Sequence, residues 1–353
     1  MNENEKYALV TSPSRAIEKI APGVKRILSS MVADTLAAAK RGQSVLAEAR
    51  FRIGDYEWRE PDYCQILLWA KAMVMEPLEV IQQLVAINEQ WKRRSEEEDE
   101  IDEYELGPIF DDGAIKTIYW DFDLLPLKTF EWVEGLVVRE LVFTSSSDKA
   151  PTIALNLPHL VHLACQMMDL TELDLSGVPR LTSLYCDGNK LTKLDLSKVP
   201  MLSNLDCGSN QLCKLHLSGV PMLIELHCQS NRLTKLDVSH VPRLKQLNCT
   251  HNKLAELDLS GSVQLTDLGC GGNQLTKLDL FKAPKLNSLN CWDNRIAELD
   301  LSHVPMLETL NCIGNKLEKL DITAQENLKV LYYFHVQAIE ARPHLIQRPD
   351  QYF

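Results

Sequence analysis

Residues 181–201 read LTSLYCDGNKLTKLDLSKVPM, and rows of the same length and pattern follow one another through much of the chain. Eight full rows of 21 residues share the pattern L-x-x-L-x-C-x-x-N-x-L-x-x-L-D-L-S-x-V-P-x. They begin at Leu160, Leu181, Leu202, Leu223, Leu244, Leu265, Leu286 and Leu307, and a partial ninth row begins at Leu328. A fixed period of this length is typical of proteins built from stacked repeats.

Each row predicts a short strand followed by a turn. The fourth and sixth places are apolar and the third and fifth are mostly polar, an alternation typical of a strand with one buried face. In seven of the eight rows an Asn stands three residues after the Cys, where its amide can bond backbone groups of its own turn and the next. We therefore expect a ladder of asparagines at Asn189, Asn210, Asn231, Asn252, Asn273, Asn294 and Asn315. The S-x-V-P segment then predicts the return corner.

Eight of the ten cysteines recur every 21 residues, at Cys165, Cys186, Cys207, Cys228, Cys249, Cys270, Cys291 and Cys312. Cysteine behaves as a small apolar side chain, which suits a narrow interior. Successive strands lie about 4.8 Å apart, farther than the roughly 3.8 Å between the beta carbons of a disulfide. Tetrahedral zinc needs ligands that converge, whereas these thiols lie in a line. The sequence therefore predicts free thiols packed in the core, with no metal and no cofactor.

The row L-x-x-L-x-C-x-x-N-x-L resembles the conserved segment of the leucine-rich repeat family, with Cys in a Leu position. The following L-x-x-L-D-L is similar to the nested 21-residue class of bacterial leucine-rich repeats, sometimes called IRREKO. This resemblance implies a right-handed solenoid with a parallel sheet on its concave side, a second short strand on its convex side, and protein binding as the usual task. It does not extend to residues before about 115. Met168, Tyr333 and Val336 depart from the pattern, as capping rows do.

The whole chain is expected to be an α+β protein, a helical N-terminal domain followed by a leucine-rich-repeat solenoid. Apolar residues recur at spacings of three and four from Ile17 to Leu36 and from Leu67 to Val85, which predicts amphipathic helices. The expected division is a helical domain (1–95), an acidic linker (96–110), degenerate capping repeats (111–159), eight repeats (160–327) and a C-terminal cap (328–353). The acidic run of the linker is either a solvated connection or a docking site for a basic partner.

Composition narrows the classes of function. The 353 residues carry a net charge of -12, whereas nucleic-acid binding rests on clustered Lys and Arg. We find neither a membrane-length apolar run nor a basic secretory start, so we expect a soluble, cytoplasmic monomer that binds neither nucleic acid nor membrane. Export by a signal-less route is left open. The sequence holds no H-E-x-x-H, G-x-x-x-x-G-K-[ST] or G-x-S-x-G motif, which favours a protein that is not an enzyme.

The second strand of each row carries an aspartate at its fifteenth place, as at Asp195 and Asp237, except in the row that has His216. Stacked carboxylates repel one another unless backbone donors or cations bind them. In several rows a Lys stands two residues earlier, so we expect a structural ladder paired with Lys, with calcium as the sharper alternative. Cys213, in the same row as His216, replaces the Thr or Ala found at its place in most other rows.

Comparison between rows predicts the recognition surface. The convex places repeat almost unchanged, whereas the fifth and seventh places, which point out of the concave sheet, differ from row to row. Aromatic anchors dominate the energetics of interfaces, so the large residues near Trp292 are candidates for partner binding. They form either a binding surface or the seat of the C-terminal tail. The predicted binding residues are Tyr185, Asp206, His227, Asn248, Asn290, Trp292, Asn311, Ile313, Tyr332 and Phe334.

The function predicted from these patterns is a non-enzymatic scaffold that binds a protein partner, whose identity the sequence does not give, on the concave face of the solenoid. The alternative is a bacterial effector or toxin-like protein whose N-terminal helical domain carries the activity and whose repeats target it. The two are distinguished by whether residues 1–110 alone retain a phenotype.

Overall fold

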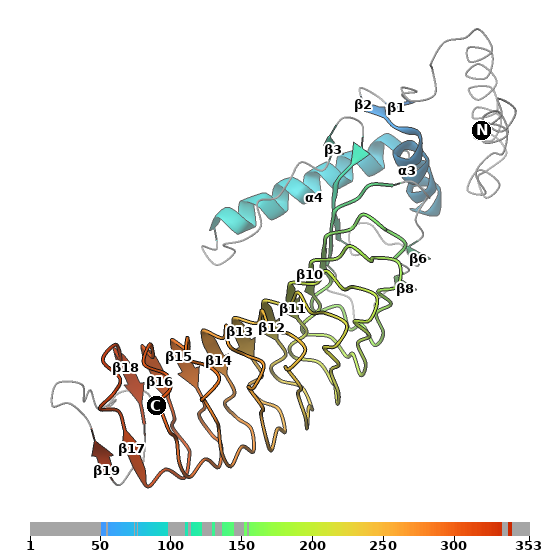
Figure 1. The fold of residues 1–353 in the computed structure, drawn as a ribbon. Coiled ribbons are helices and arrows are strands. Elements are labelled where there is room, and N and C mark those ends of the chain that lie inside the picture. The colour runs from blue at the N-terminus through green and yellow to red at the C-terminus, as the bar shows by residue number, and fades with distance from the viewer. Residues whose placement is uncertain are drawn as a thin grey trace, which may run out of the picture. The chain divides into compact units, whose positions relative to one another are not determined.

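The computed structural model describes residues 51–53, 56–73, 75, 77–97, 110–111, 114–121, 129–130, 136–144, 152–153, 155–333 and 338–340. The chain divides into two compact units, Met1–Val138 and Arg139–Phe353. Figure 1 shows the described helices in the first unit and the repeated turns in the second. Among the described residues, no helix is both long enough and apolar enough to cross a bilayer.

The first unit contains a short hairpin, β1 (Phe51–Ile53) and β2 (Tyr56–Trp58), then α3 (Glu60–Met73) and α4 (Pro77–Glu97). Strands β3 (Phe110–Asp111), β4 (Ala114–Ile115), β5 (Thr117–Asp121) and β6 (Thr129–Phe130) follow. The apolar spacing from Leu67 to Val85 thus lies in α3 and α4. The hairpin was not predicted, and the helix predicted over Ile17–Leu36 lies outside the described residues, as does most of the 96–110 linker.

Proline fits the first position of α4 because that position needs no N–H donor. Val80, Ile81, Leu84 and Ile87 recur at spacings of one, three and three, and all four are buried. This helix packs against α3 and β5. Asp62 of α3 is fully buried, and its carboxylate accepts hydrogen bonds from the Arg59 guanidinium (2.7 Å) and from a backbone N–H of β4 (2.8 Å).

The second unit is a solenoid in which each row of 21 residues makes one turn. It has the strands β7 (Glu140–Thr144), β8 (Thr152–Ile153), β9 (His162–Ala164), β10 (Ser183–Tyr185), β11 (Asn204–Asp206), β12 (Glu225–His227), β13 (Gln246–Asn248), β14 (Asp267–Gly269), β15 (Ser288–Asn290), β16 (Thr309–Asn311), β17 (Lys319–Asp321), β18 (Val330–Tyr332) and β19 (Ala338–Glu340). The main sheet runs in the order β7, β9 to β16, β18, and every one of these neighbours pairs in parallel. The register matches equivalent places, such as Leu184 with Leu205. The predicted parallel-sheet solenoid is confirmed (Figure 1).

The interior repeats from turn to turn. All eight ladder cysteines are free and at most 1% exposed, so the predicted cysteine ladder is confirmed. Burial among Leu side chains opposes ionisation and raises the pKa of Cys165, Cys249 and Cys312 to about 12. The ladder cysteines are therefore protonated core side chains at neutral pH.

The asparagines tie each turn to the one before it. The Asn210 amide donates to the carbonyls of Cys186 (2.9 Å), Cys207 (3.2 Å) and Gly208 (3.0 Å), and its Oδ1 accepts the N–H of Leu191 (2.9 Å). The same set of partners recurs at Asn231, Asn252, Asn273 and Asn294, all buried. Four bonds per side chain satisfy turn backbone that water does not reach.

The prediction of a second, convex strand in every row was wrong. Among the described residues from Leu155 onward, the convex side has two isolated bridges, Asn156 with Gly177 and Asp237 with Asp258, and one strand pair, β17 with β19. The reason is local competition for donors. The N–H at the seventeenth place bonds to the aspartate of its own row, as in Ser197 to Asp195 (2.9 Å), and the corner closes on itself by Val199 N–H to the Leu196 carbonyl (3.2 Å).

The predicted pairing of these aspartates with Lys is also corrected in three rows. Between residues 155 and 333, Lys193, Lys235 and Lys277 form no ion pair with the aspartate two residues later, whereas each of these aspartates accepts a backbone N–H at 2.9 Å. A fixed backbone donor requires no ordering of a long side chain, which an exposed Lys does. In the described part of the chain, no group of three or more His, Cys, Asp or Glu side chains is placed to hold a metal ion.

Candidate functional site

The concave face is formed by the third, fifth and seventh places of the rows, since the fourth and sixth places are buried in the interior. The strand register sets residues of the fifth place side by side. Asp206 pairs with Tyr185 and His227, and Asn311 pairs with Asn290 and Tyr332. The structure thus brings into one row the predicted residues Tyr185, Asp206, His227, Asn248, Asn290, Asn311 and Tyr332.

The N-terminal part of this row is held in place by hydrogen bonds. The Asp206 Oδ1 accepts the N–H of Gly208 (2.9 Å), and its Oδ2 lies 3.7 Å from Nδ1 of His227. The Asp206 carboxylate raises the pKa of His227, against the opposing effect of partial burial. In the same two rows, at the third place, the Asn204 amide donates to Glu225 (2.7 Å). The surface here presents oriented polar groups and a histidine that binds a proton more readily than usual.

Asp187, at the seventh place, adds to this charge. Burial raises the pKa of its carboxyl group, and the nearby Asp206 carboxylate raises it further. Its Oδ1 is shielded from solvent and has no hydrogen-bond partner, as is the Oε1 of Gln229 two turns on. Both are acceptors enclosed without a donor, an arrangement that costs free energy.

Trp292 contacts the turns that precede it. The indole lies over Gly271, where a beta carbon would clash with Nε1, and it meets the His251 ring edge-on at 5.0 Å between centroids. Gly271 therefore makes room for the indole. The sequence grouped Trp292 with Ile313 and Phe334, but its aromatic contact is with His251. Ile313 is half-buried on the adjacent turn, and Phe334 and the tail from 341 onward lie outside the described residues.

Sequence reasoning did not consider the third place, and at the seventh place its predicted binding residues were Trp292, Ile313 and Phe334, without Asp187 of the acidic part. Asn204, Glu225 and Asp187 belong to the same surface as Asp206 and His227. The signal was present in the alternation, since the third place faces the same side as the fifth and also differs between rows. Gln229 could not have been found, because its importance rests on an unpaired atom that only the structure shows.

A comparison with solved structures places this fold. The chain is similar to the functional domain of InlJ from Listeria monocytogenes, a structure described as including a cysteine ladder, with 30% identity and a TM-score of 0.50 over 62% of this chain and 53% of that one. This chain is a leucine-rich repeat protein. The ladder of buried thiols is a feature that this leucine-rich repeat protein shares with its structural relative.

Another leucine-rich repeat structure, YopM from Yersinia enterocolitica, is 25% identical with a TM-score of 0.49, over 60% of this chain and 50% of that one. The chain thus spans about half the length of these two structures. No protein-family model matches the chain, and a search of curated proteins finds no match.

Proposed function

We propose that this leucine-rich repeat protein is a non-enzymatic scaffold that binds a protein partner on its concave face. The observation that carries the proposal is the contrast between places in the row. Interior places repeat because adjacent turns must stack, whereas the fifth place changes from Tyr185 through Asp206 and His227 to Tyr332 on an equally regular backbone. Variation on a rigid sheet supports recognition, because little ordering entropy is lost on binding.

The charge of the face indicates the chemistry of the partner. At the third, fifth and seventh places of the eight full rows, the charged groups are Asp187, Asp206, Glu225 and Asp267, with no Lys or Arg. A partner that carries Lys or Arg opposite the second to fourth rows would be steered and oriented by these carboxylates. The C-terminal rows, with Trp292 and Ile313, offer apolar contact area.

The test is an affinity capture with three baits: wild type, a surface control, and a variant with Tyr185→Ala, Asp206→Ala, His227→Ala and Trp292→Ala. Thr234→Ala with Lys277→Ala, both exposed on the convex side, serves as a matched surface control. We expect one partner to be lost by the quadruple variant and kept by the control. Its affinity for the purified wild type should then fall as the salt concentration rises. Partners that all baits retain equally would contradict binding at the concave face.

A further inference from the structure

The convex side has one row that lacks a carboxylate. In the other seven full rows, an aspartate Oδ1 accepts the backbone N–H two residues later, at 2.8–2.9 Å. In the third row His216 takes this place, and an imidazole does not reproduce a carboxylate oxygen at that position. Within the described residues, the N–H of Ser218 has no hydrogen-bond acceptor in the protein.

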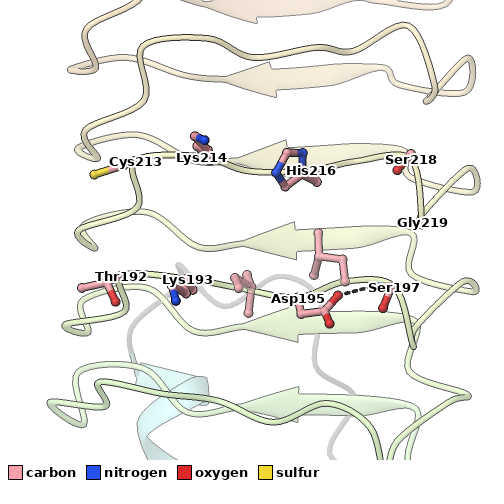
Figure 2. Close-up of a pocket in the computed structure, with 11 residues that line it drawn as sticks. Thr192, Lys193, Asp195, Ser197, Cys213, Lys214, His216, Ser218 and Gly219 are labelled. Atoms are coloured by element: carbon pink, nitrogen blue, oxygen red, sulfur yellow. Dashed lines mark hydrogen bonds between the residues drawn. The ribbon is translucent and has the colours of Figure 1, made fainter.

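A groove of about 620 Å³ lies at this point, between the convex segments of the second and third rows. Figure 2 shows Lys193 and Lys214 toward the end of the groove near Cys213, with His216 between them and Ser218. Its volume falls in the range of ligand-binding clefts. The groove therefore joins an unused backbone donor to a set of cationic and polar side chains.

The charges favour an anion in this groove. Neither Lys193 nor Lys214 forms an ion pair in the described part of the chain. Asp195, the carboxylate that lines the groove, is already bound to the N–H of Ser197 at 2.9 Å. The replacement of aspartate by His216 removes the negative charge that would otherwise stand beside Lys214. An acidic segment lying along the groove would meet two ammonium groups toward one end and a free N–H donor toward the other.

We propose that this groove binds an acidic segment of a partner protein, whose Asp or Glu carboxylate accepts the Ser218 N–H in place of the missing aspartate. Lys193 and Lys214 contribute the attraction, and His216 leaves the carboxylate position open. The segment lies along the convex surface, so that this site is separate from the concave face and does not depend on it.

The first experiment measures the fluorescence anisotropy of a labelled oligo-aspartate peptide with the full chain, with an oligo-asparagine peptide as the neutral probe. We expect binding of the acidic probe alone. His216→Asp supplies the carboxylate internally and should weaken binding about tenfold, as should Lys214→Ala. Lys277→Ala, in a row that keeps its aspartate at Asp279, should leave binding unchanged.

The same variants also test whether a loss of binding comes from a loss of structure. His216→Asp restores the pattern of the other rows, so its melting temperature should equal or exceed that of the wild type, and a loss of binding is then not a loss of structure. Unchanged binding by His216→Asp would overturn the proposal. Displacement of the peptide by inorganic phosphate at constant ionic strength would overturn the acidic peptide as occupant in favour of a free oxyanion.

The exposed thiol of Cys213 supplies a readout within the groove. Saturating oligo-aspartate should slow alkylation of Cys213 by iodoacetamide, followed by mass spectrometry of the peptide that contains it. The neutral peptide should give no protection. An alkylation rate that does not change while the acidic peptide is bound would place the peptide elsewhere and refute the site.

Discussion

Two rows of polar side chains run along the solenoid at the same spacing, asparagines in the interior and aspartates on the convex surface. Each interior Asn bonds the backbone of its own turn and of the preceding turn, as Asn210 does. Each Asp bonds the N–H two residues later in its own turn, as Asp195 does. The Asp row is interrupted by His216 with the parallel sheet intact on either side. Stacking therefore constrains the identity of a side chain that bonds two adjacent turns, whereas a side chain that bonds only its own turn can be replaced by another residue type.

The largest effect is expected where this coupling is cut. Asn231→Ala removes an amide that donates to Cys207, Cys228 and Gln229 and accepts from Leu212. Buried backbone groups then lose their partners, and the free energy of unfolding should fall by about 3–5 kcal/mol. Urea unfolding followed by circular dichroism measures the change.

Asn252→Ala removes the same set of contacts one turn further along, so it should lower the free energy of unfolding by a similar amount. Thr234→Ala, exposed in the same row as Asn231, is the control and should stay within about 0.5 kcal/mol of wild type. Equal losses for Asn231→Ala and Thr234→Ala would show that the interior bonds do not couple the turns.

A smaller loss of unfolding free energy is expected when a polar side chain replaces a cysteine of the ladder. Cys249 is fully buried among Leu side chains, and Cys249→Ser places a hydroxyl there that is more costly to bury than a thiol. We expect a loss of about 2 kcal/mol. Cys213→Ser, on the exposed surface, should change the free energy of unfolding little. If Cys249→Ser matched wild type in urea, the thiols would not be acting as apolar core.

The comparison also predicts a stabilising change. Ser262 is fully buried at a place where five other rows have Val, and its hydroxyl has no hydrogen-bond partner. Ser262→Val removes this unpaired group and should raise the free energy of unfolding by about 1 kcal/mol. Ser262→Ala separates the two contributions, since it removes the hydroxyl without adding the Val methyl groups. A destabilised Ser262→Val would mean that this corner is too tight for Val.

The interior was predictable from the sequence because each side chain there contacts its own equivalents in adjacent turns. Cys228, for example, lies between Cys207 and Cys249, so the period alone placed it. The structure of the convex side was not predictable from the sequence. The choice between a strand ladder and local turns depends on whether the backbone N–H of Ser197 donates to Asp195 or to a neighbouring turn. The contact of Trp292 with His251 depends on a rotamer that reaches across Gly271, which no pattern of single places contains.

The smallest effect on stability is expected for the exposed aspartates of the convex surface. The Ser239 hydroxyl and N–H both donate to Asp237 Oδ1, at 2.6 and 2.9 Å, and they hold the pKa of this carboxyl group below its usual value of about 3.9. Because the pKa is lower in the folded state, the stabilisation is present above the unfolded pKa and is lost as the pH falls through the folded pKa. Asp237→Ala should therefore melt slightly below wild type at neutral pH, and the two melting temperatures should converge in acid. Thermal unfolding across a pH series measures this. A gap of constant size from neutral pH to acid would show that Asp237 acts through packing and not through its charge, and the surface row would then resemble the interior one.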